Sequence, residues 1–314
     1  MDKESIREAF GKSLVEIGRI DEKVVVVDAD LSVSTKTDYF KKTFPGRFVN
    51  VGIAEQNLIG VSAGLASAGM TVFASSFSVF ETGRAFEIIR NMVCIAKLNV
   101  KLCATHAGLM TGEDGGTHQS IEDIAIMRAL PNMSIMVPSD AEETRQMLKY
   151  MSENNGPMYL RLVRDDLENI NLEEDYIFEF GKAKQFSEGD DLTIIACGPM
   201  VWEAIKAAEI LREKGILARV INMSTIKPID TEMIVKCAKE TEIIITVEDH
   251  SIIGGLGSAV SEVVCENNPA IVRKIGVCDK FGVSGSTEEL YEHFGLTHNN
   301  IVDTALELMN ENYE

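Results

Sequence analysis

Short apolar runs alternate with segments of helical periodicity along most of this chain, and this alternation restricts the fold more than any other feature. In the first half, strands are expected at residues 24–27, 48–51, 71–74, 100–104, 134–136 and 158–161. Segments with a helical period, such as 84–97 and 141–153, separate these runs. Apolar strands joined by helices form parallel sheets covered by helices on both faces. The pattern therefore predicts a doubly wound α/β domain.

A second α/β series begins after an acidic, irregular stretch at 165–179. Its first apolar run, 192–197, follows the polar sequence Glu188-Gly-Asp-Asp. Irregular charged stretches of this kind separate compact units. We therefore expect three parts, namely a first domain at 1–170, a linker at 171–190 and a smaller doubly wound domain at 191–314.

A glycine-rich segment of the second domain has two possible roles. Ile253-Gly-Gly-Leu-Gly-Ser-Ala259 follows an expected strand and opens a helix, where backbone N–H groups can bind phosphate. Its spacing does not match Gly-x-Gly-x-x-Gly, and a lone glycine motif is weak evidence of a ligand. Close packing of strand against helix is the favoured interpretation, and a ligand loop is the alternative.

Composition argues against several classes of partner. The chain of 314 residues is 45% apolar and 25% charged, as in ordinary soluble proteins with well-formed cores. Its formal net charge of -19 argues against nucleic acid or a membrane surface as partner, because both attract basic surfaces. The sequence contains no signal peptide and no apolar stretch long enough to cross a membrane. Its six cysteines lack metal-binding spacing and are predicted to be reduced thiols of a cytoplasmic protein.

One carboxylate occupies a position where folding does not require an acid. The segment Phe48-Val-Asn-Val-Gly-Ile-Ala-Glu-Gln-Asn57 places Glu55 between an apolar strand and a helix of small residues. The start of such a helix should lie close to neighbouring backbone, and a sheltered carboxylate is costly unless something binds it. The alternative is an ordinary acid that the dipole favours at a helix N-terminus.

Two aromatic residues follow in Ala74-Ser-Ser-Phe77-Ser-Val-Phe80. Two phenylalanines three residues apart are more often part of a core. With small neighbours on either side, they can also form the wall of a flat pocket.

A glycine-rich loop carries the third signal. The sequence Thr105-His106-Ala-Gly-Leu-Met-Thr-Gly-Glu-Asp114-Gly-Gly-Thr-His118-Gln119 combines two histidines with two acids between an apolar strand and a helix. A lone loop histidine is more often structural or solvated. So many titratable groups in one loop are typical of a functional site.

These three motifs, in this order, resemble the pyrimidine-binding half of the transketolases. Those enzymes use thiamine diphosphate to move two-carbon ketol units between sugar phosphates. The resemblance covers essentially the whole chain and continues into a C-terminal domain of the expected kind. Three ordered motifs are specific, whereas any one alone would be weak.

The resemblance implies roles for the residues near the cofactor. Glu55 matches the family glutamate that bonds to N1′ of the aminopyrimidine and favours the tautomer that removes the C2 proton, so we expect it to be catalytic. Phe77 and Phe80 match positions that pack on the pyrimidine ring, and Asp30 matches a residue lining the cofactor region. The segment after Phe80, Glu-Thr-Gly-Arg-Ala-Phe86, is one residue longer than in some relatives.

For the substrate, His106, Asp114 and His118 match transketolase residues that hold sugar hydroxyls or phosphate and assist proton transfer. The resemblance therefore assigns substrate binding to all three and catalysis to the two histidines. A histidine suits this work because its ordinary pKa lies near working pH.

The family's phosphate-binding positions match Arg7, Ser34 and Arg164. Two guanidinium groups and a hydroxyl suit a sugar phosphate dianion. They also supply the local positive charge that so acidic a chain needs for an anionic substrate. Arg7 could equally be a solvated side chain on an exposed helix.

The motif with which the family holds Mg²⁺ and the diphosphate is missing. That motif is Gly-Asp-Gly followed by an asparagine pair, and this chain contains no Gly-Asp-Gly. We therefore expect no metal ligand in this chain. The resemblance implies one subunit of a split transketolase, active with a separate N-terminal subunit that carries the motif, in a heterotetramer of two copies of each.

Several alternatives stay open. 1-Deoxyxylulose 5-phosphate synthase shares Gly-Ile-Ala-Glu-Gln but usually has His-His where this chain has His118-Gln119. A split enzyme for an unusual sugar is another candidate, and Gly116, where proline is common, leaves loop rigidity and substrate choice open. The beta subunit of a 2-oxoacid dehydrogenase usually lacks this loop. A non-catalytic assembly protein with the same fold is disfavoured by the retained acid, histidines and arginines.

Overall fold

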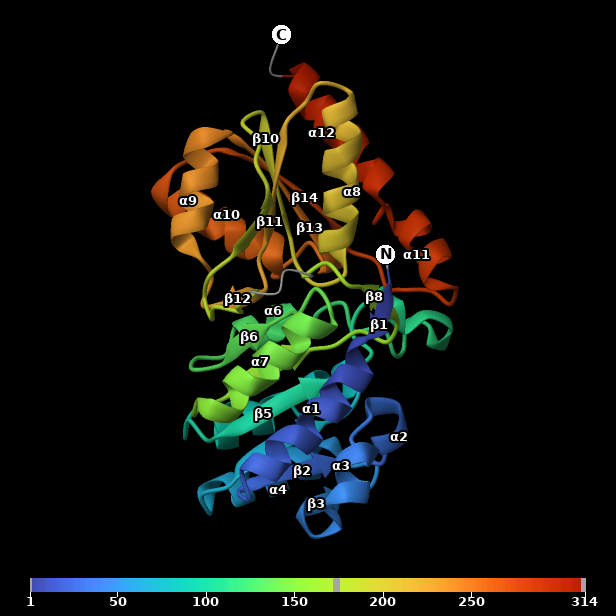
Figure 1. Cartoon of the computed structure of the whole chain (residues 1–314), viewed down its shortest axis with the longest axis vertical. Helices are drawn as coiled ribbons and strands as arrows, with labels where there is room; N and C mark the ends of the chain where they lie inside the picture. The colour runs from blue at the N-terminus through green and yellow to red at the C-terminus, as the bar shows by residue number, and fades with distance from the viewer. Residues whose placement is uncertain (1, 172–175, 312–314) are drawn as a thin grey trace.

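The protein folds into two α/β units stacked along the long axis of the molecule (Figure 1). This computed structural model describes residues 2–171 and 176–311. The first unit is built on a seven-stranded sheet and the second on a five-stranded sheet, both mostly parallel. The predicted pair of doubly wound domains is therefore confirmed. Residues 172–175 of the predicted linker lie outside the described residues.

The larger sheet has the strand order β12-β6-β7-β5-β4-β2-β3. Its strands are β2 (Val24–Asp28), β3 (Phe48–Asn50), β4 (Thr71–Ser75), β5 (Val100–Ala104), β6 (Ser134–Met136), β7 (Met158–Arg161) and β12 (Thr225–Lys227). Neighbours are parallel except β12, which runs antiparallel to β6. Because strand residues alternate between faces, Val24 and Val26 belong to one apolar core and Val25 and Val27 to the other.

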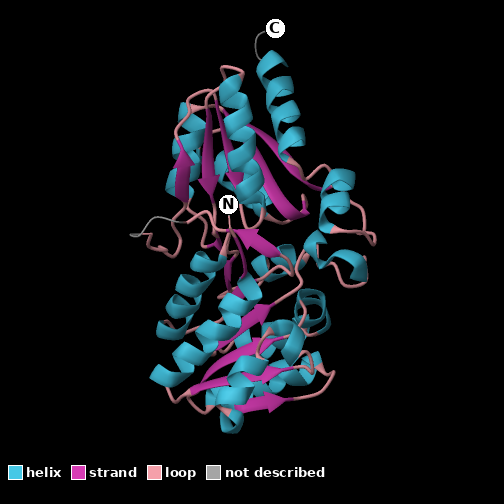
Figure 2. Ribbon diagram, turned by 45° about the vertical axis from the view of Figure 1, so that its right-hand side comes forward, coloured by secondary structure: helices cyan, strands magenta, loops and turns pink. Residues whose placement is uncertain are grey.

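Helices cover both faces of this sheet, as the cyan and magenta layers of Figure 2 show. One core contains residues of α1 (Ile6–Ile20), α3 (Asp38–Thr43) and α7 (Ala141–Glu153). The other contains residues of α4 (Glu55–Ser67) and α6 (Asp123–Arg128). Short elements complete the unit: α2 (Ser32–Thr35), η1 (Pro45–Arg47), η4 (Leu109–Asp114) and the antiparallel pair β1 (Lys3–Ser5) and β8 (Asp166–Glu168).

The helix expected at 84–97 is replaced by a chain of wider turns. Two π-helices, η2 (Val79–Arg84) and η3 (Ile89–Cys94), flank the short α5 (Phe86–Ile88). A π-turn accommodates one more residue than an α-turn and is frequent at functional sites. The segment that contains Phe80 therefore begins as a wider turn close behind β4.

The second unit contains the sheet β14-β13-β10-β11-β9. Its strands are β9 (Lys184–Ser187), β10 (Leu192–Ala196), β11 (Ala218–Asn222), β13 (Ile243–Ser251) and β14 (Ile271–Val277), and only the edge strand β9 is antiparallel to its neighbour. Helices α8 (Met200–Glu213) and α12 (His298–Glu311) lie to one side of the sheet, and α9 (Thr231–Glu240) and α10 (Leu256–Asn267) to the other (Figure 1). Helix α11 (Thr287–Phe294) lies beside the junction with the first unit.

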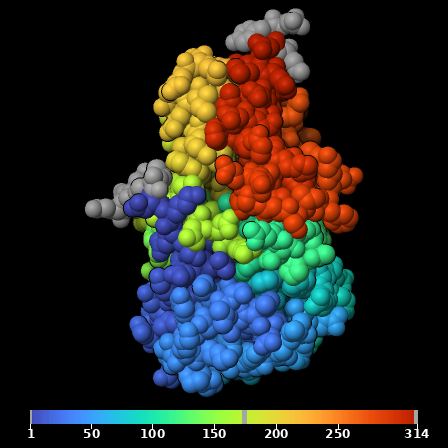
Figure 3. Space-filling view, turned by 90° about the vertical axis from the view of Figure 1, so that its right-hand side faces the viewer, coloured from blue at the N-terminus to red at the C-terminus, as the bar shows by residue number. Residues whose placement is uncertain are grey.

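The two units are joined through buried contacts. Strand β12 comes from the second half of the chain but completes the sheet of the first unit. Arg161 forms a buried ion pair with Asp123, 2.7 Å from Nε to Oδ2, and donates to the carbonyl of Asp249 at 2.9 Å. Both apolar cores contain residues of both units. The space-filling view shows the resulting close contact, with orange and red atoms directly on green ones (Figure 3).

No helix among residues 2–171 and 176–311 is long and apolar enough to cross a bilayer.

Candidate active site

The predicted site residues collect at one edge of the larger sheet. Strands β7, β5, β4, β2 and β3 are parallel neighbours in that order, so the segments that follow their carboxyl ends meet along one edge. Arg164 follows β7, the loop with both histidines follows β5, Phe77 and Phe80 follow β4, Asp30 and Ser34 follow β2, and Glu55 follows β3. Arg7 joins them from the first turn of α1.

Strand pairing continues past the ends of β4 and β5 and determines where two rings lie. The N–H of Ser78 donates to the carbonyl of Thr105 at 2.7 Å, and the N–H of Thr105 donates to Ser76 at 3.0 Å. Phe77 and His106 therefore stand side by side, with ring centroids 3.8 Å apart and planes inclined by 25°.

Phe80 and His118 extend this pair into an aromatic wall. Phe80 is stacked on Phe77 with ring centroids 6.1 Å apart, and the His118 ring meets Phe80 edge-on at 5.2 Å. Phe77 is buried, whereas Phe80 and His118 are half-buried. A flat, partly open apolar surface of this kind fits an aminopyrimidine ring without competing for its nitrogen atoms.

Glu55 lies at the end of this wall, paired with an arginine that the sequence analysis missed. It is the first residue of α4 and is 2% exposed. Nη1 of Arg84 lies 2.5 Å from its Oε2, and the Arg84 guanidinium lies 5.1 Å from the centre of the Phe80 ring. Arg84 ends the π-turn behind β4. No local sequence pattern indicates this pair, because Arg84 and Glu55 are 29 residues apart in the chain.

Glu81 is a second functional candidate that the sequence analysis missed. It is fully buried; its Oε2 accepts from the N–H of Ser76 at 3.1 Å, and its Oε1 has no hydrogen-bond partner among the described residues. Burial, followed by the charges of Asp28 and Glu55, raises the pKa of Glu81 well above its ordinary value. Burial therefore favours the protonated form of this carboxyl group more than in an exposed glutamate.

The three residues assigned to phosphate binding lie together. Nε of Arg7 donates to the carbonyl of Arg164 at 2.9 Å, and its Nη1 donates to the carbonyl of Ser34 at 3.0 Å. Burial and then the charge of Arg164 lower the pKa of Arg7. Two neighbouring guanidinium groups repel each other, and a bound dianion relieves that repulsion. This corner of the site suits a phosphate.

Arg164 also connects this corner to the glycine-rich loop. Its Nη1 donates to the carbonyl of Thr111 at 2.8 Å and lies 3.6 Å from Oδ2 of Asp114. Arg164 is partly exposed and Asp114 is exposed. The structure therefore brings an acid and a cation of the predicted substrate site into contact.

His106 differs from the titrating histidine expected from its ordinary pKa. Burial, and then the charges of Arg7, Arg164 and His118, lower the pKa of His106 to about 3. Its Nδ1 is hydrogen-bonded to Oγ1 of Thr105 at 2.9 Å. His106 is therefore neutral at physiological pH and acts there as a hydrogen-bonding group.

Asp30 lies in the turn after β2. Its φ of 67° is left-handed, and its Oδ1 accepts from Nδ2 of Asn50 at 2.8 Å. The buried Asp28 organises this turn by accepting hydrogen bonds from the hydroxyls of Thr35 and Thr37 at 2.9 and 2.8 Å. The turn carries Ser34 toward Arg7.

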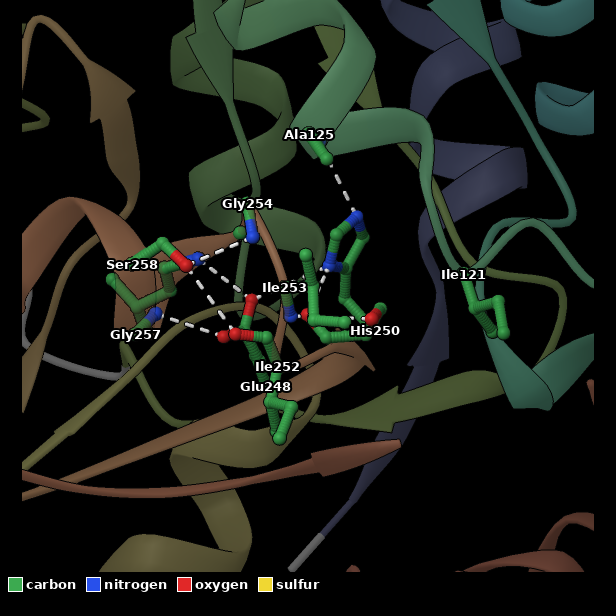
Figure 4. A network of polar contacts seen from close by, with 12 residues as sticks. Ile121, Ala125, Glu248, His250, Ile252, Ile253, Gly254, Gly257 and Ser258 are labelled. Atoms are coloured by element: carbon green, nitrogen blue, oxygen red, sulfur yellow. Dashed lines mark hydrogen bonds and ion pairs between the residues drawn. The ribbon is translucent and has the colours of Figure 1, made fainter. Parts of the chain in front are cut away.

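The second glycine-rich segment is filled by the protein itself. Oε2 of Glu248 accepts from the N–H of Leu256 at 2.6 Å and Oε1 accepts from Gly257 at 2.8 Å, so a carboxylate occupies the start of α10 (Figure 4). A Cβ on Gly255 would lie 2.0 Å from Oε2 of Glu248. The favoured interpretation, close strand–helix packing, is therefore the arrangement that the structure has.

Among the residues that the structure describes, no group of three or more His, Cys, Asp or Glu side chains is placed to hold a metal ion.

Comparison with known families assigns the chain. Residues 2–169 match the family model for the transketolase pyrimidine-binding domain, and residues 181–301 match the model for the transketolase C-terminal domain. The chain belongs to the transketolase family. Its pyrimidine-binding domain implies thiamine diphosphate as the cofactor, and the aromatic wall beside Glu55 has the shape for such a ring.

Individual relatives cover nearly all of the chain. It is 52% identical to a putative transketolase C-terminal section of Methanocaldococcus jannaschii, over 97% of this chain and 96% of the relative. It is 42% identical to one subunit of the apulose-4-phosphate transketolase of Phocaeicola vulgatus, over 96% and 97%. A solved structure described as a split-gene transketolase, an inactive beta4 tetramer, matches with a TM-score of 0.90 and 50% identity over 98% of each chain. The chain thus corresponds to the C-terminal section of a split transketolase.

Proposed function

We propose that this chain is the pyrimidine-binding subunit of a transketolase that transfers a two-carbon ketol unit from a ketose phosphate to an aldose phosphate. The observation that carries the proposal is the arrangement along one sheet edge. A sheltered carboxylate, Glu55, stands beside an aromatic wall, and Arg7, whose Nε donates to the backbone carbonyl of Arg164, lies at the same edge. A cofactor ring and a sugar phosphate need these two surfaces next to each other.

Thiamine diphosphate, when bound, supplies the nucleophilic carbon that accepts the ketol unit. Glu55 would share a proton with the ring nitrogen N1′ and so help to activate the bound cofactor. Phe77 and Phe80 hold the flat ring and keep water from it. Arg84 orients the Glu55 carboxylate through their ion pair.

The substrate residues divide the remaining work. Arg7, Ser34 and Arg164 bind the phosphate. His106, neutral at working pH, hydrogen-bonds a sugar oxygen, while His118 moves protons at the reacting carbons and Asp114 accepts from a sugar hydroxyl.

A second subunit completes the site in this proposal. It carries the Gly-Asp-Gly motif, holds Mg²⁺ and the diphosphate, and forms a heterotetramer with this chain. In support, this chain lacks the motif, and a 42% identical relative is named as one subunit of a transketolase. All six cysteines are free, which supports the reducing cytoplasm as its location.

Two substrate classes are considered. The pentose phosphates of central carbohydrate metabolism are the first proposal. The relative that acts on apulose 4-phosphate favours an unusual phosphorylated sugar as the second candidate. A synthase of 1-deoxyxylulose 5-phosphate is a weaker alternative, because the loop has His118-Gln119 where that enzyme usually has His-His.

The test is reconstitution with a purified partner subunit. The chain alone should fold, bind thiamine diphosphate weakly and show no ketol transfer, and the mixture should transfer ketol units from xylulose 5-phosphate to ribose 5-phosphate. Comparing kcat/KM for pentose phosphates and apulose 4-phosphate in the mixture then selects the substrate class. Turnover by this chain alone, with the partner rigorously excluded, would disprove the two-subunit proposal.

A further inference from the structure

The C-terminal domain contacts the glycine-rich loop of the active site at both ends of the loop. We call residues 105–119 the substrate loop and residues 279–285, between β14 and α11, the clamp segment. The first contact is at the start of the substrate loop, where Oδ1 of Asp249 accepts from the N–H of Leu109 at 2.9 Å. Gly108 has a φ of 72°, and a Cβ on it would lie 2.2 Å from Oδ2 of Asp249.

The second contact is at the far end of the substrate loop, where glycines on both sides let the backbones touch. A Cβ on Gly116 would lie 2.4 Å from the carbonyl oxygen of Gly282, and a Cβ on Gly282 would lie 1.7 Å from Oε1 of Gln119. Real Cβ atoms do not approach so closely, because such contacts are strongly repulsive. At Gly116 the obstacle is backbone, so only glycine fits there, whereas a side chain at position 282 would have to displace the amide of Gln119.

A buried side chain ties the two segments together. Nε2 of Gln119 donates to the carbonyl of Val283 in the clamp segment at 2.9 Å and to the carbonyl of Gly112 in its own loop at 3.2 Å. Gln119 is 3% exposed, so both hydrogen bonds are sheltered from water. A proline at position 116 would stiffen this loop from within, whereas here packing against another domain holds it from outside.

The substrate loop also fixes the positions of the residues assigned to the substrate relative to one another. It carries Asp114 and His118, and the carbonyl of Thr111 accepts from Arg164. A shift of the loop would therefore move an acid, a histidine and a guanidinium relative to one another. It would leave Glu55 and Arg84 in place, because they come from the turns behind β3 and β4.

We infer that the C-terminal domain is a positioning element for catalysis, in which the clamp segment and Asp249 set the substrate loop and so determine how well sugar phosphates are bound. This inference rests on the proposed function, since it assigns the loop to the substrate. It gives the second domain a role in substrate selection that is separate from cofactor activation.

The test compares two glycine substitutions in the clamp segment of the reconstituted enzyme. In Gly282→Ala the new methyl group presses on Gln119, whereas in Gly285→Ala the nearest atom is 3.5 Å away, an ordinary contact. A misplacement of about 1 Å in a site can cost about a hundredfold. We expect kcat/KM for ketol transfer to fall about tenfold or more in Gly282→Ala, chiefly through KM, and to stay within about twofold in Gly285→Ala.

Cofactor C2 proton exchange, measured on the same samples, separates the possible outcomes. It should fall much less than ketol transfer in Gly282→Ala, because Glu55, Arg84, Phe77 and Phe80 lie outside the substrate loop. Equal loss of exchange and transfer, or equal effects of the two alanines, would overturn the inference. An inactive wild type would instead count against the proposed function.

A second variant removes the hydrogen bonds of Gln119 to the clamp segment and to its own loop without adding a side chain to the clamp segment. Gln119→Leu loses both donated hydrogen bonds at nearly constant volume, so KM for the donor and acceptor sugar phosphates should rise by a larger factor than C2 exchange slows. Gly282→Ala with Gln119→Ala should be no worse than Gln119→Ala alone, because the colliding amide is gone. If Gly282→Ala does not fold, Gln119→Leu decides alone, and a normal KM in that variant would overturn the inference.

Discussion

Both domains carry a glycine-rich segment behind a parallel strand, and the two segments serve different ends. In the C-terminal domain the carboxylate of Glu248 takes the N–H groups at the start of α10. In the first domain the substrate loop instead presents the exposed Asp114 beside Arg164 and the half-buried His118 beside Phe80. Glycine in both cases permits close approach of backbone. Glycine content is therefore similar in the two segments. Whether a ligand can bind depends on whether a side chain of the protein, such as Glu248, already occupies the backbone N–H groups.

The acids of the two domains differ in the same way. Glu55 is paired with the half-exposed Arg84 and faces the aromatic wall. Glu248 is fully buried, and this burial raises its pKa to about 7. One acid is available for chemistry and the other contributes to the packing of its domain. Four predictions test this contrast, in order of decreasing effect on the reaction.

The largest effect is expected for Glu55→Gln in the reconstituted enzyme. The amide cannot exchange a proton with the cofactor ring, so C2 proton exchange should slow by about a hundredfold to ten-thousandfold. NMR of deuterium uptake at C2 measures this directly, and gel filtration checks that the complex still assembles. Near-normal exchange would show that Glu55 is not the activating acid and would remove the contrast with Glu248.

Arg164→Ala should weaken transfer to phosphorylated acceptors. A lost charge-assisted hydrogen bond is worth about 1.5–3 kcal/mol, which is about a tenfold to hundredfold drop in kcat/KM for ribose 5-phosphate. A short unphosphorylated aldehyde is the control and should change little. His118→Ala should slow both acceptors, because that residue serves the reacting carbons. Equal losses for both acceptors in Arg164→Ala would contradict the phosphate assignment.

Arg84→Met should slow C2 exchange by up to about tenfold, because the Glu55 carboxylate loses a partner that is itself half exposed. Arg90→Met is the matched control. Arg90 is also an exposed arginine of the π-helical region, and its Nη1 donates to Oδ1 of Asn91 at 2.7 Å. A rate equal to that of the control would mean that Arg84 does not orient Glu55.

Glu248→Gln should leave transfer within about twofold at a temperature where the protein is folded, but it should alter stability. The glutamine amide has an NH2 group in place of one carboxylate oxygen, so either Leu256 or Gly257 loses the acceptor for its backbone N–H. This should lower the free energy of unfolding by about 1–3 kcal/mol. Loss of transfer without loss of stability would show that the second glycine segment also serves the reaction.

The pH dependence of unfolding sharpens this last prediction. The folded-state pKa of Glu248, about 7, exceeds its ordinary value of 4.5, so the folded protein binds the extra proton between these pH values. The contribution of Glu248 to the free energy of unfolding is therefore full at low pH and declines as pH rises from 4.5 to 7. Denaturant titrations of both proteins should show the free energy of unfolding of the wild type falling relative to that of Glu248→Gln, by up to about 3 kcal/mol, as pH rises across this window.

Much of this protein follows from local sequence patterns. Apolar runs and helical periods predict the parallel strands, because each pattern depends on neighbouring residues. Glu55, Phe77 and His106 are predicted as site residues from the resemblance of their motifs, and each lies within five residues after such a strand, at the edge that the carboxyl ends of parallel strands share. Short edge strands such as β9 and β12 escaped prediction, because a few residues at an edge need not carry an apolar pattern.

Local sequence patterns do not predict contacts between segments that are distant in the chain. The sequence by itself determined the two α/β domains, the sheet edge on which the motifs lie and the identity of the acid at the start of α4. Only the tertiary structure decided that Arg84 meets Glu55, that Glu248 fills the second glycine segment and that Gly282 touches the substrate loop. The physical reason is that these contacts depend on which strand ends and loops become neighbours and on the direction of a single π-turn, and packing of the whole chain sets both.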